Sequence, residues 1–290
     1  MTSPVTGRFA PSPSGPLHYG SLLAAVASFL NIRSQKGCWL VRIEDLDPPR
    51  EAAGASADIL RALEQYGLLW DKEIIYQSRR SEFYDEALSQ LTNDDLLYRC
   101  SCSRKEIALR GETVYQGYCR KGCQTERKHY SLRIRTPVRS ICWTDLIQGK
   151  QEFSLAESAG DFIVRRTDKL YAYHLAVVID DAEQQITEII RGADLLTSTP
   201  AQKHLQEVLG MQSPLYGHIP VAVNAKGEKL SKQTGADAVS MNDPARTLFR
   251  TLQDLGQAPP SDLEASSVED VLEWGADNWD LKMVPAGKTL

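Results

Sequence analysis

The apolar pattern at the start of the chain predicts a strand, a turn, a helix and a second strand. Residues 5–10 are typical of a short strand, and two prolines and a glycine then interrupt any regular element. A helix is predicted from about Gly20, because apolar side chains recur there at helical spacing. These side chains are Leu22, Leu23, Val26, Phe29 and Leu30. The continuous apolar run 38–43 is typical of a buried strand, so we expect the start of a parallel α/β sheet.

The rest of the chain continues this alternation and ends in helices. Helical patterns are predicted near 55–67, 81–96 and 197–210, and strand-like stretches near 129–136 and 160–167. The pattern returns to α/β from Tyr171, over residues 173–181 and 187–196. The last fifty residues predict two or three helices with a break at Pro259 and Pro260.

Composition places the chain among ordinary globular proteins. Hydrophobic residues make up 42% of its 290 positions and charged residues 24%, which excludes disordered, collagenous and coiled-coil classes. No apolar run is long enough to span a membrane, and the first residues lack the basic and apolar regions of a signal peptide. We therefore expect a cytoplasmic protein without membrane contact. No apolar stripe demands a dimer, so we expect a monomer.

Charge is unevenly distributed along the chain. The net charge of −5 excludes a wholly basic nucleic-acid binder. Residues 99–128, however, hold eight basic and three acidic side chains, whereas residues 241–290 hold four basic and nine acidic ones. A local basic segment can contact phosphates even when the total charge is negative. The alternative is a solvated loop with no partner.

Cysteines cluster within this basic segment. Nothing else indicates secretion, so we expect reduced thiols. Two pairs of thiolates separated by a short segment of chain can supply the four tetrahedral ligands of a structural zinc ion. The alternative is a set of unrelated core residues. We expect Cys38 and Cys142 to be buried structural thiols. The four clustered cysteines are Cys100, Cys102, Cys119 and Cys123.

Two short motifs suggest phosphate chemistry. His18 and Gly20 lie where the first helix is predicted to begin, and a helix N-terminus offers free N–H groups and a positive dipole end to a phosphate. The alternative for His18 is a helix cap or a packed side chain. Lys229 and Lys232 follow a glycine and can neutralise charge on a departing phosphoryl group. The alternative is an ordinary exposed loop.

Together these motifs, HYGS at 18–21 and KLSK at 229–232, resemble the HIGH and KMSKS signatures of class I aminoacyl-tRNA synthetases. Further stretches are similar to glutamyl-tRNA synthetases, and the resemblance covers most of residues 5–240. It implies an α/β fold of the class I synthetase type, with a Rossmann-type parallel sheet, a zinc-containing insertion and a short C-terminal helical region. The stretches are GRFAPSPSG at 7–15, RIEDLDPPR at 42–50, YHLAVVIDD at 173–181 and IIRGADLLTSTPAQ at 189–202.

The resemblance also implies a division of the chain. We expect the first half of the catalytic domain over 1–97 and its second half, with the KLSK loop, over 169–238. Between them, 98–168 would form the insertion with the zinc segment. The remaining residues, 239–290, would form a short helical region without an anticodon-binding domain.

Full-length glutamyl-tRNA synthetases are longer and carry C-terminal domains that read the anticodon. The shorter chain and the cysteine segment resemble instead the truncated members of the family. These ligases activate glutamate with ATP without needing tRNA, and attach it to the queuosine base in the anticodon loop of tRNA(Asp). Two alternatives stay open: a minimal enzyme that charges the 3′ end of tRNA(Glu), and a non-catalytic synthetase-like binding protein.

A pocket for L-glutamate is implied by the same resemblance. Bidentate arginines suit the two carboxylates of this substrate, so Arg8 and Arg191 are the candidates for that pairing. Which of them holds the side-chain carboxylate stays open. Glu44 would accept the substrate ammonium group, and Tyr173 would close the pocket. The full set of implied glutamate-binding residues is Arg8, Phe9, Ala10, Pro11, Ser12, Glu44, Tyr173 and Arg191.

Nucleotide binding is implied for both signature motifs. His18 and Gly20 would hold the phosphates of ATP, with Mg²⁺ bound to the nucleotide. Lys229 and Lys232 would be catalytic together with His18 and Gly20. Lys232 would also bind ATP and stabilise the α-phosphate and the departing pyrophosphate.

The family pattern changes the expected zinc shell. Spacing alone favours four cysteines, whereas the family pattern C-x-C followed by Tyr-x3-Cys replaces one of them by a tyrosine. We follow the family pattern and keep Cys123 as a competitor. One structural Zn²⁺ is therefore expected on Cys100, Cys102, Tyr115 and Cys119.

Overall fold

A parallel sheet forms the centre of the molecule. The computed structural model describes residues 4–112, 114–123, 125, 127–223 and 237–290. Strands β1, β2 and β3 pair in parallel in that order, and β9 pairs in parallel with β10. The N–H of Thr187, just before β9, donates to the carbonyl of Thr6 at 2.8 Å, which brings β9 beside β1. The strands are β1 (Thr6–Phe9), β2 (Cys38–Ile43), β3 (Ile75–Tyr76), β9 (Glu188–Gly192) and β10 (Leu215–Ile219).

Helices connect these strands and cover the sheet. Helix α1 is buried along most of its length, and it approaches β1 so closely that a Cβ at Gly7 would lie 2.5 Å from Cγ1 of Ile32. This close approach explains the glycine in the middle of a buried strand. The helices of this part are α1 (Tyr19–Arg33), α2 (Ala55–Gln65), α3 (Ser81–Asn93), α6 (Tyr173–Glu183) and α7 (Thr199–Val208). Short 3-10 helices lie at η1 (Pro48–Arg50), η2 (Gln77–Arg79) and η3 (Ala193–Ser198).

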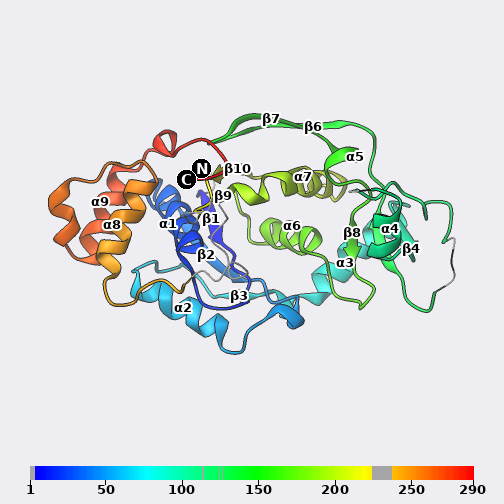
Figure 1. Cartoon of the computed structure of the whole chain (residues 1–290), viewed down its shortest axis with the longest axis horizontal. Helices are drawn as coiled ribbons and strands as arrows, with labels where there is room; N and C mark the ends of the chain where they lie inside the picture. Colours follow the sequence, from blue (N-terminus) through cyan, green and yellow to red (C-terminus); the bar gives the residue numbers. More distant parts are fainter. Residues whose placement is uncertain (1–3, 113, 124, 126, 224–236) are drawn as a thin grey trace.

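The segment between the two halves of the sheet is antiparallel. Strands β4, β5 and β8 form one sheet, and β6 and β7 form a hairpin. Figure 1 shows β4, β8 and α4 at one end of the molecule and the hairpin running back past α7 to β10. The elements are β4 (Leu97–Cys100), α4 (Arg104–Leu109), β5 (Ser131–Ile134), β6 (Ser140–Asp145), β7 (Gly149–Ser154), α5 (Leu155–Ser158) and β8 (Ile163–Arg165).

The C-terminal helices occupy the opposite end (Figure 1). Helices α8 (Pro244–Asp254) and α9 (Val268–Asn278) pack against each other and against α1. A Cβ at Gly275 would lie 3.1 Å from Cδ1 of Leu30, so α9 sits closely on α1. The 3-10 helices η5 (Ser261–Ala265) and η6 (Leu281–Met283) complete this part. The prediction of two or three helices after residue 240 is confirmed.

Most of the predicted elements are confirmed, but several strands were not anticipated. β4, β6, β7 and β10 carry a mixture of polar and apolar residues, and β3 is only two residues long. The prediction that Cys142 is buried is wrong, because it lies on the exposed face of the β6–β7 hairpin; Cys38 is half-buried. None of the helices in the described part of the chain is long and apolar enough to cross a membrane.

Candidate active site

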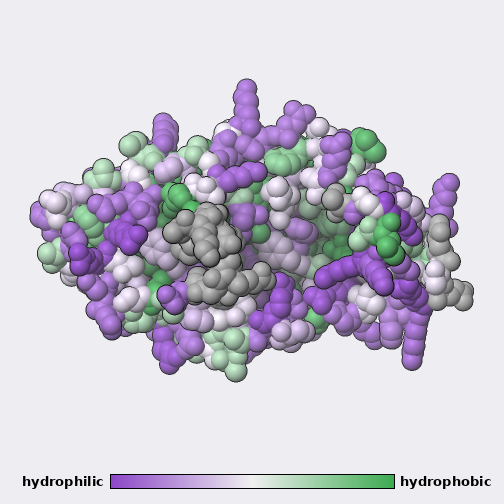
Figure 2. Space-filling model, in the orientation of Figure 1, coloured by the Kyte–Doolittle hydropathy of each residue, from purple (hydrophilic) through white to green (hydrophobic). Residues whose placement is uncertain are grey.

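A cavity of about 460 Å³ lies at the carboxyl ends of the parallel strands. β1, β2, β9 and β10 all deliver residues to it at this edge, the place where open α/β sheets bind ligands. Every expected glutamate- or phosphate-binding residue in the described ranges lines this one cavity. They are Arg8, Phe9, Ala10, Pro11, Ser12, His18, Gly20, Glu44, Tyr173 and Arg191. On the face shown in Figure 2, the surface is hollowed between the centre and the end that carries α4.

Further cavity residues were missed by sequence reasoning. Asp194 and Leu195 follow β9, within the stretch 189–202 that resembles glutamyl-tRNA synthetases. Val221 and Ala222 follow β10, a strand that the sequence pattern did not predict. Local pattern carries no signal for these residues, because only the order of strands in the sheet brings them to the cavity.

The two lysines expected to be catalytic, Lys229 and Lys232, lie outside the described residues. The chain on either side of that gap does reach the cavity. Ala222 lines it, and Ala238 forms an isolated β-bridge with His18. The N–H of Val239 also donates to the carbonyl of Leu17 at 2.9 Å.

His18 caps helix α1 and also lines the cavity. Its Nδ1 accepts the N–H of Ser21 at 3.2 Å, and its Nε2 lies 3.0 Å from the Ser21 hydroxyl. His18 is therefore a helix cap, the alternative role given above, and the N-terminal turn of α1 lies at the cavity wall. The N–H groups of a first helical turn lack partners within the helix and suit an anionic ligand.

Arg8 is neutralised by a buried carboxylate. Its Nε and Nη2 donate to the two carboxylate oxygens of Asp181 at 2.9 and 3.2 Å, and Arg42 donates to the same carboxylate at 2.8 Å. Burial raises the pKa of Asp181, but the two arginines outweigh this and hold it below its usual value. Asp181 therefore stays ionised, and much of the charge of Arg8 is compensated inside the protein.

A second carboxylate, Asp180, ties α6 to neighbouring elements behind the cavity. It accepts hydrogen bonds from Gln77 at 2.7 Å, from Arg80 at 2.6 Å and from the Tyr84 hydroxyl at 2.9 Å. The Nε of Arg42 lies 3.8 Å from it. Buried charges are tolerated only when they are paired and hydrogen-bonded, and this network satisfies that condition.

Glu44 has an unusual protonation equilibrium. Its side chain is only 7% exposed, and burial raises its pKa to about 7. Arg42 and Arg8 oppose this shift, whereas Asp181 and Asp180 add to it. Glu44 is thus a carboxyl group that is close to half ionised at neutral pH, and a cationic group bound beside it would favour its ionised form.

Arg191, in contrast, is held by neutral groups. Its Nε donates to Nε2 of His218 at 3.0 Å, and its Nη2 donates to the Thr199 hydroxyl at 3.0 Å and to the Leu195 carbonyl at 3.4 Å. Its Nη1 is buried without a hydrogen-bond partner in the described ranges, and no carboxylate within those ranges forms an ion pair with it. Of the two candidate arginines, Arg191 is therefore the one whose charge is available to a ligand.

The cysteine segment converges on one point. The thiol sulfurs of Cys100, Cys102 and Cys119 all lie within 4.8 Å of one another. The Tyr115 hydroxyl is 3.7 Å from the sulfur of Cys102 and accepts the N–H of Cys119 at 2.9 Å. Cys123 is exposed, and its thiol donates to the Arg99 carbonyl at 3.3 Å instead. Three sulfurs and a phenol oxygen form a donor set that fits a tetrahedral metal such as zinc.

The chain belongs to a family of class I synthetases. Residues 4–280 match the family described as tRNA synthetases class I (E and Q), catalytic domain. A crystal structure of a glutamate tRNA ligase from Elizabethkingia meningosepticum, in complex with its amino acid, is similar with a TM-score of 0.83 and 25% identity. That match covers 99% of this chain and 67% of the other. The class I synthetase fold expected from the sequence is confirmed.

Close relatives of this chain carry a more specific name. A protein named Glutamyl-Q tRNA(Asp) synthetase from Dechloromonas aromatica (strain RCB) is 49% identical over 292 residues, which cover 98% of this chain and 97% of that protein. A protein of the same name from Chromobacterium violaceum is 49% identical over 286 residues, covering 97% of this chain and 95% of that protein.

Proposed function

We propose that this chain is an ATP-dependent ligase that activates L-glutamate to glutamyl adenylate without tRNA. It then transfers the glutamyl group to the queuosine base in the anticodon loop of tRNA(Asp). The observation that carries the proposal is the 49% identity, over nearly the whole chain, to proteins named for that reaction. The cavity supports it, because it combines an arginine of uncompensated charge with a buried carboxyl group.

Glutamate binding uses both groups. Arg191 holds a substrate carboxylate with its free Nη1, and Glu44 accepts the substrate ammonium group. Arg8 contributes less net attraction, because Asp181 is already paired with it. Arg191 therefore holds the side-chain carboxylate, the feature that separates glutamate from neutral amino acids. Tyr173 lines the same cavity as Glu44 and closes the pocket.

Adenylate formation needs no nucleophile from the protein. The α-carboxylate of glutamate attacks the α-phosphorus of ATP, a P–O bond forms, and the bond to pyrophosphate breaks. His18 and Gly20, at the first turn of α1, hold the phosphates, and Mg²⁺ enters bound to the nucleotide. Lys229 and Lys232 neutralise the charge that develops on the α-phosphate and the leaving pyrophosphate. A queuosine hydroxyl then attacks the glutamyl carbonyl and releases AMP.

The cysteine segment holds a structural Zn²⁺ on Cys100, Cys102, Tyr115 and Cys119. Four protein ligands leave no open position, so the metal organises the segment and takes no part in the reaction. Basic side chains beside it, Arg99 and Lys128 among them, line a groove that suits RNA phosphates. The insertion 98–168 thus serves tRNA binding, between the two halves of the catalytic domain, and residues 239–290 form the short helical region that supports α1.

The test is glutamate-dependent exchange between ATP and pyrophosphate with no tRNA present. Exchange without RNA supports tRNA-independent activation, and transfer of labelled glutamate to queuosine-containing tRNA(Asp) then supports the second step. Transfer to the same tRNA lacking queuosine contradicts the proposed acceptor.

A second candidate is charging of the 3′ end of tRNA(Glu), favoured by the 0.83 TM-score to a glutamate tRNA ligase. ATP–pyrophosphate exchange that starts only after tRNA(Glu) is added favours this charging reaction. ATP binding without exchange under either condition indicates a non-catalytic protein.

A further inference from the structure

Behind Arg191 lies a fully buried pair, His218 and Asp145. Neither side chain has measurable exposure. Nδ1 of His218 lies 2.5 Å from Oδ2 of Asp145, and the N–H of His218 donates to Oδ1 at 3.0 Å. Nε2 of the same imidazole receives the Nε–H of Arg191 at 3.0 Å. The three residues form one hydrogen-bonded line that ends at the cavity.

The direction of these hydrogen bonds defines the tautomer of His218. An arginine Nε always carries a proton, so Nε2 of His218 acts as the acceptor. A neutral imidazole then carries its proton on Nδ1 and donates it to Asp145. Burial lowers the pKa of His218, and although Asp145 opposes this, the net shift keeps the ring neutral at pH 7. Burial raises the pKa of Asp145, but hydrogen bonds from the His218 ring and from the backbone N–H groups of Gln148 and His218 outweigh it and hold this pKa below its usual value.

Asp145 is itself fixed by the tip of the β6–β7 hairpin. Its Oδ1 accepts the N–H groups of Ile147 at 3.2 Å and Gln148 at 3.0 Å, in addition to that of His218. The tip is locked onto β10, because the N–H of Leu146 donates to the Tyr216 carbonyl at 2.8 Å. The hairpin therefore delivers a carboxylate from the antiparallel segment to the back of the catalytic sheet.

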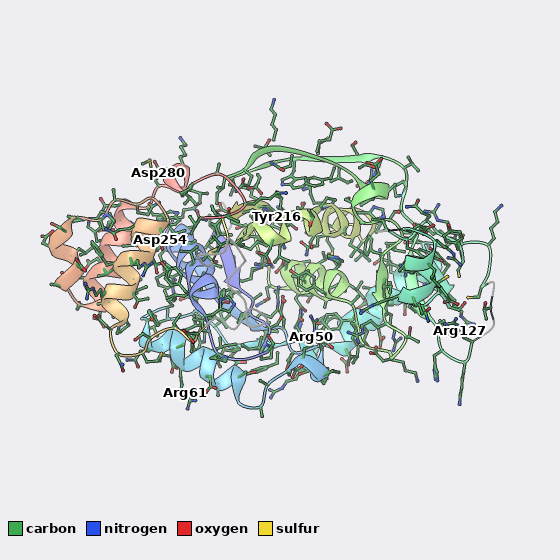
Figure 3. The ribbon with its side chains drawn as sticks, viewed as in Figure 1. Arg50, Arg61, Arg127, Tyr216, Asp254 and Asp280 are labelled. Carbon is green, nitrogen blue, oxygen red and sulfur yellow. The ribbon has the colours of Figure 1, made fainter. Side chains whose placement is uncertain are left out.

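Tyr216 completes the support for Arg191. The guanidinium carbon of Arg191 lies 5.1 Å from the centre of the Tyr216 ring, and this ring stacks on His218 at 6.1 Å. Figure 3 shows Tyr216 inside the molecule near α7, where Gln206 donates to its hydroxyl at 2.8 Å. An arginine held by a ring face and a directed acceptor has little freedom to turn.

We propose that Asp145 and His218 are positioning residues that hold Arg191 in the orientation required for a carboxylate of the substrate. They thereby set the affinity for a dicarboxylic amino acid and its preference over the neutral amide. The proposal rests on the proposed function, since it assigns the Arg191 ligand as glutamate. It predicts that the β6–β7 hairpin acts on amino-acid binding and not on nucleotide binding.

Three substitutions test this chain of hydrogen bonds. Asp145→Asn leaves a single acceptor oxygen, which three backbone N–H groups already use. The new amide then faces Nδ1 as a donor, so the His218 proton moves to Nε2 and meets the Nε–H of Arg191. His218→Gln keeps an acceptor for Arg191, whereas His218→Leu fills the space without one. Asp161→Asn is the matched control, because Asp161 is equally buried, accepts several hydrogen bonds and does not line the cavity.

The readouts are the KM values for glutamate and ATP in exchange, the heat of L-glutamate binding and the thermal melting of each variant. We expect Asp145→Asn and His218→Leu to raise the glutamate KM roughly ten- to a hundredfold while the ATP KM stays within about twofold. His218→Gln should lie closer to the wild type, and Asp161→Asn should leave the glutamate KM unchanged whatever its melting temperature.

Three outcomes overturn the proposal. The first is an unchanged glutamate KM in both Asp145→Asn and His218→Leu. The second is an equal rise in the KM for ATP, and the third is a leucine variant that matches the glutamine variant, since either of these results indicates only a packing role. A wild-type chain without glutamate-dependent exchange refutes the proposed function instead. The positioning role is then decided by calorimetry, where it requires weaker L-glutamate binding in Asp145→Asn than in Asp161→Asn.

Discussion

Replacing Glu44 by glutamine should make the ligand-free protein more stable at alkaline pH and not at acid pH. Burial raises the pKa of Glu44 from 4.5 to about 7, so the folded state binds this proton more tightly than the unfolded chain does. The free energy of unfolding of the wild type therefore falls as the pH rises from about 4.5 to about 7. Above that range the whole cost of an ionised, buried Glu44 is present.

The size of the effect follows from the shift. A change from 4.5 to about 7 corresponds to about 3 kcal/mol. Glutamine has nearly the same shape and does not titrate, so it escapes this cost. Its amide oxygen can still accept from Arg42, and the charge attraction of Arg42 for an ionised Glu44 is already contained in the net shift of the pKa. The difference in unfolding free energy between Glu44→Gln and the wild type should thus grow by up to about 3 kcal/mol between about pH 5 and pH 8.

Urea denaturation at these two pH values, followed by intrinsic fluorescence, measures this difference. Glu64→Gln is the matched control, because it makes the same substitution at an exposed side chain, on α2. A Glu44→Gln advantage of the same size at both pH values would refute the reasoning, because it would show that the Glu44 pKa is not raised in the folded state. The same variant should lose glutamate-dependent exchange, since the ammonium group loses its anionic partner.

Four further outcomes are expected. Glutamate binding at about pH 7 should release protons from the wild type but not from Glu44→Gln, because the bound ammonium lowers the Glu44 pKa; calorimetry in buffers of different ionisation enthalpy measures this. Elemental analysis should show that Cys102→Ser loses bound zinc, whereas Cys123→Ser keeps one equivalent of zinc per chain. Equal loss of zinc in both variants would show that Cys123 is a ligand. Arg191→Lys should raise the glutamate KM roughly ten- to a hundredfold with little change for ATP, since lysine cannot keep the Nε and Nη2 contacts and also reach a carboxylate. Lys232→Ala should slow adenylate formation more than it weakens glutamate binding, and an unchanged exchange rate would remove Lys232 from the mechanism.

The charge arrangement explains how one cavity can bind a substrate with two carboxylates. A cavity with two free arginines would be costly to fold, because each buried charge loses its hydration. Here the charge of Arg8 is balanced by Asp181, whereas Arg191 has no carboxylate partner among the described residues. The neutral His218 stabilises that charge by accepting a hydrogen bond without cancelling it. The ligand then supplies the missing counter-charge.

The sequence alone determined what depends on neighbouring residues. Apolar runs and helical spacing predicted β1, α1 and β2, because the period of apolar residues in a buried strand or helix can be recognised from neighbouring positions alone. The family pattern then identified the cavity residues at the ends of these elements, from Arg8 to Arg191. It also identified Tyr115 as a partner of the clustered cysteines, and the convergence of Tyr115 and three thiols agrees with that expectation.

Only the tertiary structure decided which of these residues are electrostatically free. Arg8 and Asp181 are 173 residues apart, and nothing local to either indicates that they pair. Asp145 and His218 are 73 residues apart. They meet because the β6–β7 hairpin packs on β10, and the mixed polarity of β6 and β10 meant that the sequence pattern did not predict these strands. Burial, ion pairing and the protonation of Glu44 arise from segments that meet only in the folded chain. The sequence could therefore predict which of the described residues line the cavity, whereas their charges and orientations required the fold.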